Sequence, residues 1–202
     1  MGKKELSGRL NWEKLAGVNA SSAEQNLYKV FEAAFDGTKY QLIRQPRHLK
    51  NLYAHVELSE SEKAQIFNPS INFEKTQWGV SPDFAIKNMD SGKILFGEIK
   101  RQDGWVEGKK PSAGRGNAHE RCCKLFTPGL LKAYRKIGGI TNTDILPFWI
   151  VFEGDITRDP KRVREISFWF DTYKDNYYMW RPNQSGEQLV EHFNVKLKPF
   201  LD

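Results

Sequence analysis

Residues 82–101 read PDFAIKNMDSGKILFGEIKR, and this stretch decides the fold that we expect. Two short runs of strand-forming residues, 84–88 and 93–101, flank a segment of Met, Asp, Ser and Gly that is typical of a turn. Such runs on either side of a short turn predict a β-hairpin. A hairpin returns on itself, so residue 83 should meet the end of the second strand.

The open end of this hairpin carries charged side chains. Because side chains alternate between the two faces of a strand, Glu98 and Lys100 should point the same way while Ile99 enters the core. Asp83 should lie beside them. Two carboxylates can hold Mg²⁺ and an ammonium can orient water for hydrolysis of a phosphodiester, so Asp83, Glu98 and Lys100 are candidate catalytic residues. The alternative is a solvated strand face, because this pattern also arises by chance in charged proteins.

An amphipathic helix is expected near residue 21. Ser21 and Glu24 have the spacing of a capping box, and the helix should end at Gly37. Its apolar residues recur at helical spacing: Leu27, Val30, Phe31, Ala34 and Phe35.

Three more elements are expected in the second half of the chain. Residues 145–154 are apolar enough to form a strand buried on both faces. Asp159 as N-cap and Pro160 at the first helical position open a helix. Ser185 and Gln188 cap a last helix. The apolar side of that last helix should comprise Val190, Phe193, Leu197 and Phe200.

The simplest packing of these elements is an α/β fold with a central mixed β-sheet flanked by α-helices. No repeat, low-complexity tract or linker-like composition interrupts the chain, so we expect one domain over residues 1–202. Residues 38–82 contain no pattern that places an element.

Composition and charge narrow the function. The chain has 31 Lys and Arg against 25 Asp and Glu, a net charge of +6 and a pI near 9.2, which favours an anionic partner. The two cysteines, Cys122 and Cys123, are adjacent and have no third thiol to pair with, so a reducing cytoplasm is expected, with both as packing residues. No apolar run is long enough for a signal peptide or a membrane span, so no membrane partner is expected.

Residues 114–124, GRGNAHERCCK, concentrate side chains that can hydrogen-bond a planar partner. Asn can pair bidentately with adenine, Arg with guanine, and Glu can accept from exocyclic amino groups, so the segment suits base edges in the major groove. The alternative is an ordinary polar loop that enters a helix. The side chains concerned are Arg115, Asn117, His119, Glu120 and Arg121.

The hairpin matches the pattern PD…(D/E)xK in both residue types and strand placement. From GVSPDFAI through GEIKRQDGW, and on through GRGNAHER to LKAYRKIGG, the chain resembles type II restriction endonucleases of the PD-(D/E)XK superfamily, in the EcoRI branch. This resemblance implies a restriction-endonuclease-like core and a homodimer that cuts double-stranded DNA at the palindrome CAATTG with Mg²⁺. It also implies a cognate methyltransferase that acts on the same site and protects the host.

The resemblance assigns roles to single residues. It implies that Asp83 and Glu98 are metal ligands and that Lys100 is the catalytic lysine. The inner bases AATT would be read by four residues: Asn117, Ala118, Glu120 and Arg121. Arg115, upstream of the shared segment, would read the outer C·G pair or contact a phosphate. EcoRI has an apolar residue at the position of His119, so His119 is not assigned a base.

Two other functions remain open at this point. A structure- or damage-directed nuclease of the same superfamily would keep the hairpin but not the base-reading segment. A DNA-binding module without catalysis would keep the basic charge and the Arg and Asn cluster, but it would not need Asp83, Glu98 and Lys100. Further phosphate contacts could come from Lys109, Lys110 and residues 161–164, although exposed basic residues on a helix are more often solvated surface.

Overall fold

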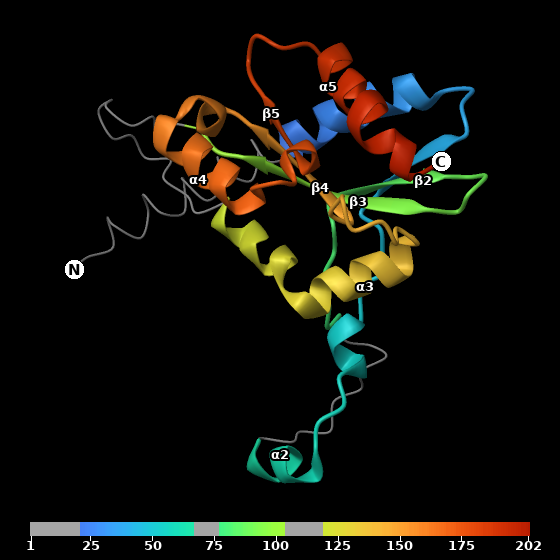
Figure 1. Cartoon of the computed structure of the whole chain (residues 1–202), viewed down its shortest axis with the longest axis vertical. Coiled ribbons are helices and arrows are strands. Elements are labelled where there is room, and N and C mark those ends of the chain that lie inside the picture. The colour runs from blue at the N-terminus through green and yellow to red at the C-terminus, as the bar shows by residue number, and fades with distance from the viewer. Residues whose placement is uncertain (1–20, 67–76, 104–118) are drawn as a thin grey trace.

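The computed structural model describes residues 21–66, 77–103 and 119–202, with a five-stranded sheet at their centre (Figure 1). Neighbouring strands in the sheet follow the order of the sequence. They are β1 (Tyr40–Arg44), β2 (Phe84–Asn88), β3 (Ile94–Arg101), β4 (Phe148–Glu153) and β5 (Tyr177–Trp180).

The sheet is mixed, as the sequence predicts. Strands β1, β2 and β3 pair antiparallel, whereas β3, β4 and β5 pair parallel. The predicted hairpin is formed by β2 and β3, and the predicted strand over residues 145–154 contains β4. A parallel pair requires a crossover, and the chain between β3 and β4 provides it.

Helices cover both faces of the sheet. Residues 21–35 are helical, and the principal later helices are α2 (Glu60–Gln65), α3 (Pro128–Gly138), α4 (Pro160–Phe170) and α5 (Gly186–His192). The short helical segments are η1 (Leu52–His55), η2 (Glu120–Phe126), η3 (Asp155–Arg158), η4 (Lys174–Asn176), the π-helix η5 (Phe193–Leu197) and η6 (Lys198–Phe200).

The alternation of side chains along the strands produces two hydrophobic cores. One core packs residues such as Ile99 and Trp149 against the first helix and α5. The other packs residues such as Phe96 and Phe148 against η2, α3 and α4. Glu98 and Lys100 lie two and four residues after Phe96 in β3, so their side chains point to the same face of the sheet as Phe96, the face of the second core. The sheet therefore presents its charged residues beside η2.

The helix starts are set by their caps, with one correction. Asp159 Oδ1 accepts from the backbone N–H groups of Lys161 at 2.9 Å and Arg162 at 3.1 Å, and it caps α4 as predicted. Ser185 is the N-cap of α5, also as predicted. Ser21, however, is itself helical and is therefore not the predicted N-cap, and the residues before it lie outside the described ranges.

The last helix buries only part of the predicted stripe, namely Phe193 and Leu197. Its fully buried residues are Leu189, Phe193, Leu197 and Leu201, whereas Val190 and Phe200 are only partly buried. The reason is the π-helical segment η5, which follows α5 directly. A π-helix has more residues per turn than an α-helix, so residues four apart stay on one face over a longer run.

The region for which the sequence predicted no element contains β1, η1 and α2. The edge strand β1 pairs with β2 in register from Tyr40↔Asn88 to Arg44↔Phe84. Helix α2 lies away from the sheet at the end of a long excursion and buries none of its residues (Figure 1). Without an apolar stripe, such a helix gives no periodic signal in the sequence.

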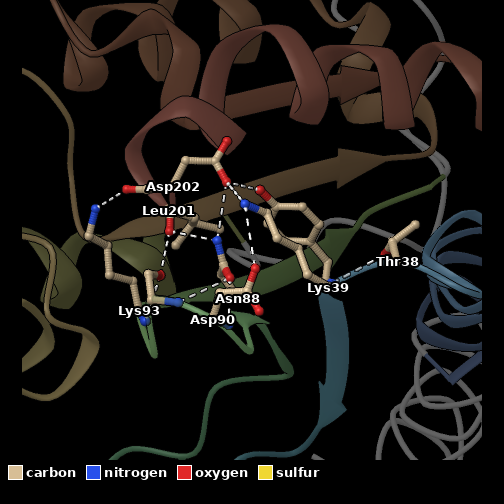
Figure 2. Close-up of polar contacts among 9 residues, drawn as sticks. Thr38, Lys39, Asn88, Asp90, Lys93, Leu201 and Asp202 are labelled. Atoms are coloured by element: carbon tan, nitrogen blue, oxygen red, sulfur yellow. Dashed lines mark hydrogen bonds and ion pairs between the residues drawn. The ribbon is translucent and has the colours of Figure 1, made fainter.

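The turn of the hairpin is held by the last residues of the chain (Figure 2). Asn88 Nδ2 donates to the backbone oxygen of Leu201 at 2.9 Å, and Ser91 Oγ donates to the same oxygen at 2.6 Å. Asp202 forms an ion pair with Lys39 at 2.8 Å. The turn of the hairpin is therefore fixed to residues 201 and 202, which lie far from it in the sequence.

Candidate active site

The strand register places Asp83 next to Glu98. Phe84 pairs directly with Gly97, so the next residues outward on the two strands are Asp83 and Glu98. Gly97 is required at this point, because a Cβ there would lie 2.1 Å from the ring of Phe84. The close approach of ring and backbone thus fixes the two strands just before the carboxylates.

Asp83 is held from both sides. Its Oδ2 accepts from the backbone N–H of Ile99 at 2.8 Å, and its backbone oxygen accepts from the hydroxyl of Tyr28 at 2.8 Å. Lys100 Nζ lies 3.3 Å from the same Oδ2. The carboxylate is therefore positioned by backbone as well as by charge.

Lys100 lies between two carboxylates. Its ammonium contacts Asp83 and donates a hydrogen bond to Glu98 Oε2. The side chains of Asp83, Glu98 and Lys100 are only 23%, 9% and 16% exposed. The structure thus brings the three predicted catalytic residues together, with one positive and two negative charges in a largely buried space.

Burial and charge oppose each other at this site. Burial raises the pKa of the Glu98 carboxyl, although Lys100 and, more weakly, Lys124 of η2 act in the other direction. Burial alone would lower the pKa of Lys100, but the two carboxylates raise it above its usual value. Lys100 is consequently an ammonium at neutral pH.

The donor set fits a hard divalent cation. Both carboxylates contact the same ammonium, so their oxygens surround one point, and Mg²⁺ is commonly bound by one or two carboxylates together with water and substrate phosphates. Within the described ranges, no group of three or more His, Cys, Asp or Glu could hold a metal. Asp83 and Glu98 would therefore need ligands from water or DNA to complete a coordination shell.

Two residues of the first helix also reach the site, and the sequence did not predict either. Burial raises the pKa of Glu24, and the charge of Asp83 raises it further. Tyr28, one turn later on the same helix, bonds to Asp83. The spacing of four residues puts both on one face, but only the tertiary fold brings that face to Asp83.

The base-reading segment is described only in part. Arg115, Asn117 and Ala118 lie outside the described residues, as do Lys109 and Lys110. Glu120 and Arg121 are exposed at the start of η2, whereas His119 is fully buried. Exposed side chains at this position are available to a partner.

The two cysteines differ from each other. Cys122 is buried, and burial raises the pKa of its thiol to about 12. Cys123 is exposed, so its predicted packing role is wrong. In a 3₁₀ segment residues three apart share a face, so Cys122 and Leu125 enter the core while Cys123 points away.

The basic run 161–164 is less available to phosphate than its sequence indicates. Arg162 Nη1 donates to Glu165 at 2.6 Å, and Arg164 Nη1 donates to the backbone oxygen of Pro160 at 2.6 Å. These partners occupy part of the donor capacity of the two guanidinium groups.

Comparison with known proteins identifies the family. The family model described as type II restriction enzyme MunI matches residues 1–202. The chain is 74% identical to the type II restriction enzyme MunI of Mycoplasma sp over 202 residues, which are 100% of both chains. The chain belongs to the MunI family of type II restriction enzymes. It is therefore a site-specific endonuclease.

The fold agrees with this membership. A crystal structure of MunI restriction endonuclease in complex with cognate DNA matches with a TM-score of 0.82 and 72% identity, covering 95% of this chain and 98% of that one. The match to this structure confirms the predicted restriction-endonuclease fold. Membership in the MunI family excludes the two alternatives, the structure-directed nuclease and the DNA-binding module without catalysis. In the part of the chain that the structure describes, no helix is both long and apolar enough to cross a membrane.

Proposed function

We propose that this MunI-family enzyme is a homodimer that cleaves double-stranded DNA at CAATTG with Mg²⁺. The observation that carries the proposal is the convergence of Asp83, Glu98 and Lys100 at the open end of the β2–β3 hairpin, in a chain that is 74% identical to MunI. The enzyme would act in the cytoplasm, where a cognate methyltransferase would protect the same sites in host DNA.

The catalytic residues would divide the work by charge. Asp83 and Glu98 would hold Mg²⁺, which supplies positive charge to the phosphoryl oxygens of the transition state. The backbone N–H of Ile99 keeps the Asp83 carboxylate in place. Lys100, an ammonium beside the free carboxylates, would donate hydrogen bonds that orient the attacking water or a phosphate oxygen.

The reading residues would lie directly ahead of and within η2. The exposed Glu120 and Arg121 would meet base edges of AATT together with Asn117 and Ala118, and Arg115 would read the outer C·G pair. Because the site is a palindrome, a two-fold symmetric pair of chains would present one copy of the segment to each half-site.

Cleavage of plasmids that differ in one site tests this function. With Mg²⁺ present, a plasmid that carries CAATTG should give discrete fragments, and a plasmid in which that site is changed to GAATTC should stay intact. In EDTA neither should be cut. General degradation of both plasmids, or binding without cleavage, would contradict the proposal.

The dimer is tested separately. Analytical ultracentrifugation of the enzyme with a short CAATTG duplex in the absence of Mg²⁺ should give two chains per duplex. A complex of one chain per duplex would contradict the symmetric reading of the palindrome, even if cleavage at CAATTG were confirmed.

A further inference from the structure

We propose that His119 is a positioning residue, which fixes the orientation of Glu120 by docking the reading segment onto α4. The inference rests on the proposed function, in which Glu120 reads a base edge.

His119 is completely buried although it precedes two exposed residues. Its exposed fraction is 0%, and its imidazole stacks on the indole of Trp169 with ring centroids 5.5 Å apart and an interplanar angle of 11°. Trp169 belongs to α4, which is anchored in the second core by Ile166 and Phe170. The stack therefore attaches the start of η2 to a rigid helix.

The imidazole also lies between two carboxylates. His119 Nε2 is 3.3 Å from Glu165 Oε2 on α4 and 4.0 Å from Glu120 Oε1. Glu165 is itself fixed by Arg162, whose Nη1 donates to it at 2.6 Å. A chain of contacts thus leads from α4 through His119 to the carboxylate of Glu120.

The backbone of His119 is fixed as well. Its carbonyl oxygen accepts from the backbone N–H of Cys122 at 3.2 Å and from Cys122 Sγ at 2.7 Å. Ring and backbone are therefore held independently, one by α4 and the other by η2. Because both the ring and the backbone of His119 are held, the direction in which the Glu120 side chain leaves the backbone is fixed.

A neutral imidazole suits this role. Burial lowers the pKa of His119, and the nearby Arg162 lowers it further, against the opposing effect of the two carboxylates. A neutral ring keeps one polar N–H, and Nε2 lies 3.3 Å from the Glu165 carboxylate as an electrostatic contact, because neither ring nitrogen makes a hydrogen bond of acceptable geometry. An apolar side chain could fill the same volume but could not link the two carboxylates.

Variants at two positions separate stacking from polar contact. His119→Phe keeps a ring on Trp169 and removes Nε2, and Glu165→Gln keeps the histidine and removes the charge of its partner. The matched control is His192→Phe, because His192 stacks on Trp149 at 5.9 Å and 15° in the other core, and its Nε2 contacts the backbone oxygen of Asp175 at 2.9 Å.

The measurement is the ratio of single-turnover cleavage rates on CAATTG and on duplexes altered within AATT. His119→Phe and Glu165→Gln should each reduce this ratio roughly tenfold, since one hydrogen-bonding contact to a base contributes about that much discrimination. The thermal unfolding midpoint should fall no more than in His192→Phe, and the control should keep the parent ratio.

The outcomes distinguish this inference from the function on which it rests. Unchanged discrimination in His119→Phe, together with a loss in Glu120→Gln, would overturn the role of His119 alone. Unchanged discrimination in Glu120→Gln would overturn the reading role of Glu120 and the inference with it. If His119→Phe does not fold, Glu165→Gln decides: a ratio equal to that of the parent would overturn the inference.

Discussion

The two ends of the β2–β3 hairpin use the same kinds of side chain for opposite purposes. At the turn, Lys39 and Lys93 contact Asp202 (Figure 2). At the open end, Lys100 contacts Asp83 and Glu98. Both ends pair lysine with carboxylate, but they differ in burial and in the number of partners that each carboxylate has.

At the turn, the charges are exposed and well matched. The side chain of Asp202 is 43% exposed, and hydrogen bonds from Lys39 and Tyr40 lower its pKa. Asn88, which is fully buried, donates to Leu201 and accepts from the backbone N–H groups of Asp90 and Ser91. The charged form of Asp202 is therefore more favourable here than in water, so this end serves stability.

At the open end, the charges are buried and incompletely matched. One lysine serves two carboxylates, and burial raises the pKa of Glu98 despite that lysine. The native surroundings of Glu98 are thus less favourable for its charged form than water is. Functional sites commonly retain such unfavourable arrangements, and the remainder of the fold compensates for them.

The largest expected effect is on cleavage at the open end. Asp83→Asn should reduce cleavage by several orders of magnitude while keeping an oxygen that can accept from the backbone N–H of Ile99. Without Mg²⁺ it should bind DNA more tightly, because removal of a negative charge relieves repulsion of order 1 kcal/mol against the phosphate. Gel retardation and single-turnover cleavage measure the two effects.

Lys100→Ala is the matched comparison. It should also lose cleavage, but it removes a positive charge and should not gain affinity for DNA without Mg²⁺. Cleavage at the parent rate in Lys100→Ala, or equal affinities of the parent and Asp83→Asn without metal, would contradict the roles assigned to these residues.

The next effect is on stability at the turn. Asn88→Ala should lower the free energy of unfolding by roughly 1–3 kcal/mol, because it removes one of two donors to the Leu201 oxygen and the acceptor of the Asp90 and Ser91 N–H groups. Asn142→Ala is the control, since Asn142 is exposed and its side chain accepts from the backbone N–H of Asp144. Urea unfolding measures both, and an equal loss in the two variants would show that the contact with Leu201 contributes little.

Glu98→Gln should make the metal-free protein more stable at neutral pH. The pKa of Glu98 is raised on folding, so the folded state binds this proton more tightly, and the carboxyl's contribution to stability is lost as pH rises through the folded pKa. Gln resembles the protonated form at every pH. The advantage of the variant should therefore disappear below pH 4.5, the ordinary value for Glu. The measurement is the urea unfolding midpoint of each protein in EDTA across this pH range. A midpoint lower for Glu98→Gln than for the parent at neutral pH would refute the idea.

Asp202→Asn should have the smallest effect and the opposite sign. The pKa of Asp202 is lowered on folding, so its contribution to stability is present above 3.8, the ordinary value for Asp, and is lost as pH falls through the folded pKa. The variant should be slightly less stable than the parent at neutral pH and equal to it in acid. Urea unfolding of Glu98→Gln and Asp202→Asn can be measured over the same pH range. The comparison would be contradicted if the stabilities of the two variants, relative to the parent, changed with pH in the same direction.

The hairpin and the meeting of Asp83, Glu98 and Lys100 could be predicted because their signals are local. Strand alternation and a short turn determine which side chains of residues 83–100 meet. The cap at Asp159 and the cap at Ser185 were predictable for the same reason. The family resemblance then favoured a catalytic role for these residues over a solvated strand face.

What the sequence did not predict depends on distant contacts. Strand β1 is an edge strand that gains its place by pairing with β2, and the four residues of β5 are placed by β4. Glu24 and Tyr28 join the site only because the first helix crosses the sheet beside Asp83. The buried stripe of the last helix shifted because no periodicity marks a π-helix in advance.

The parallel pairing of β3 and β4 also has a consequence for the order of folding. Asp83 and Lys100 are 17 residues apart in a hairpin, whereas His119 meets Glu165 only after the crossover between the two strands has closed. Hairpins form within about 1–10 μs, and contacts across long loops form later. Nascent chains should thus assemble the proposed catalytic residues before the contacts around the proposed reading residues. Pulse-labelled hydrogen exchange during refolding should find the Ile99 amide, bonded to Asp83, protected before the Gln102 amide, which is bonded to the backbone oxygen of Glu153 in β4.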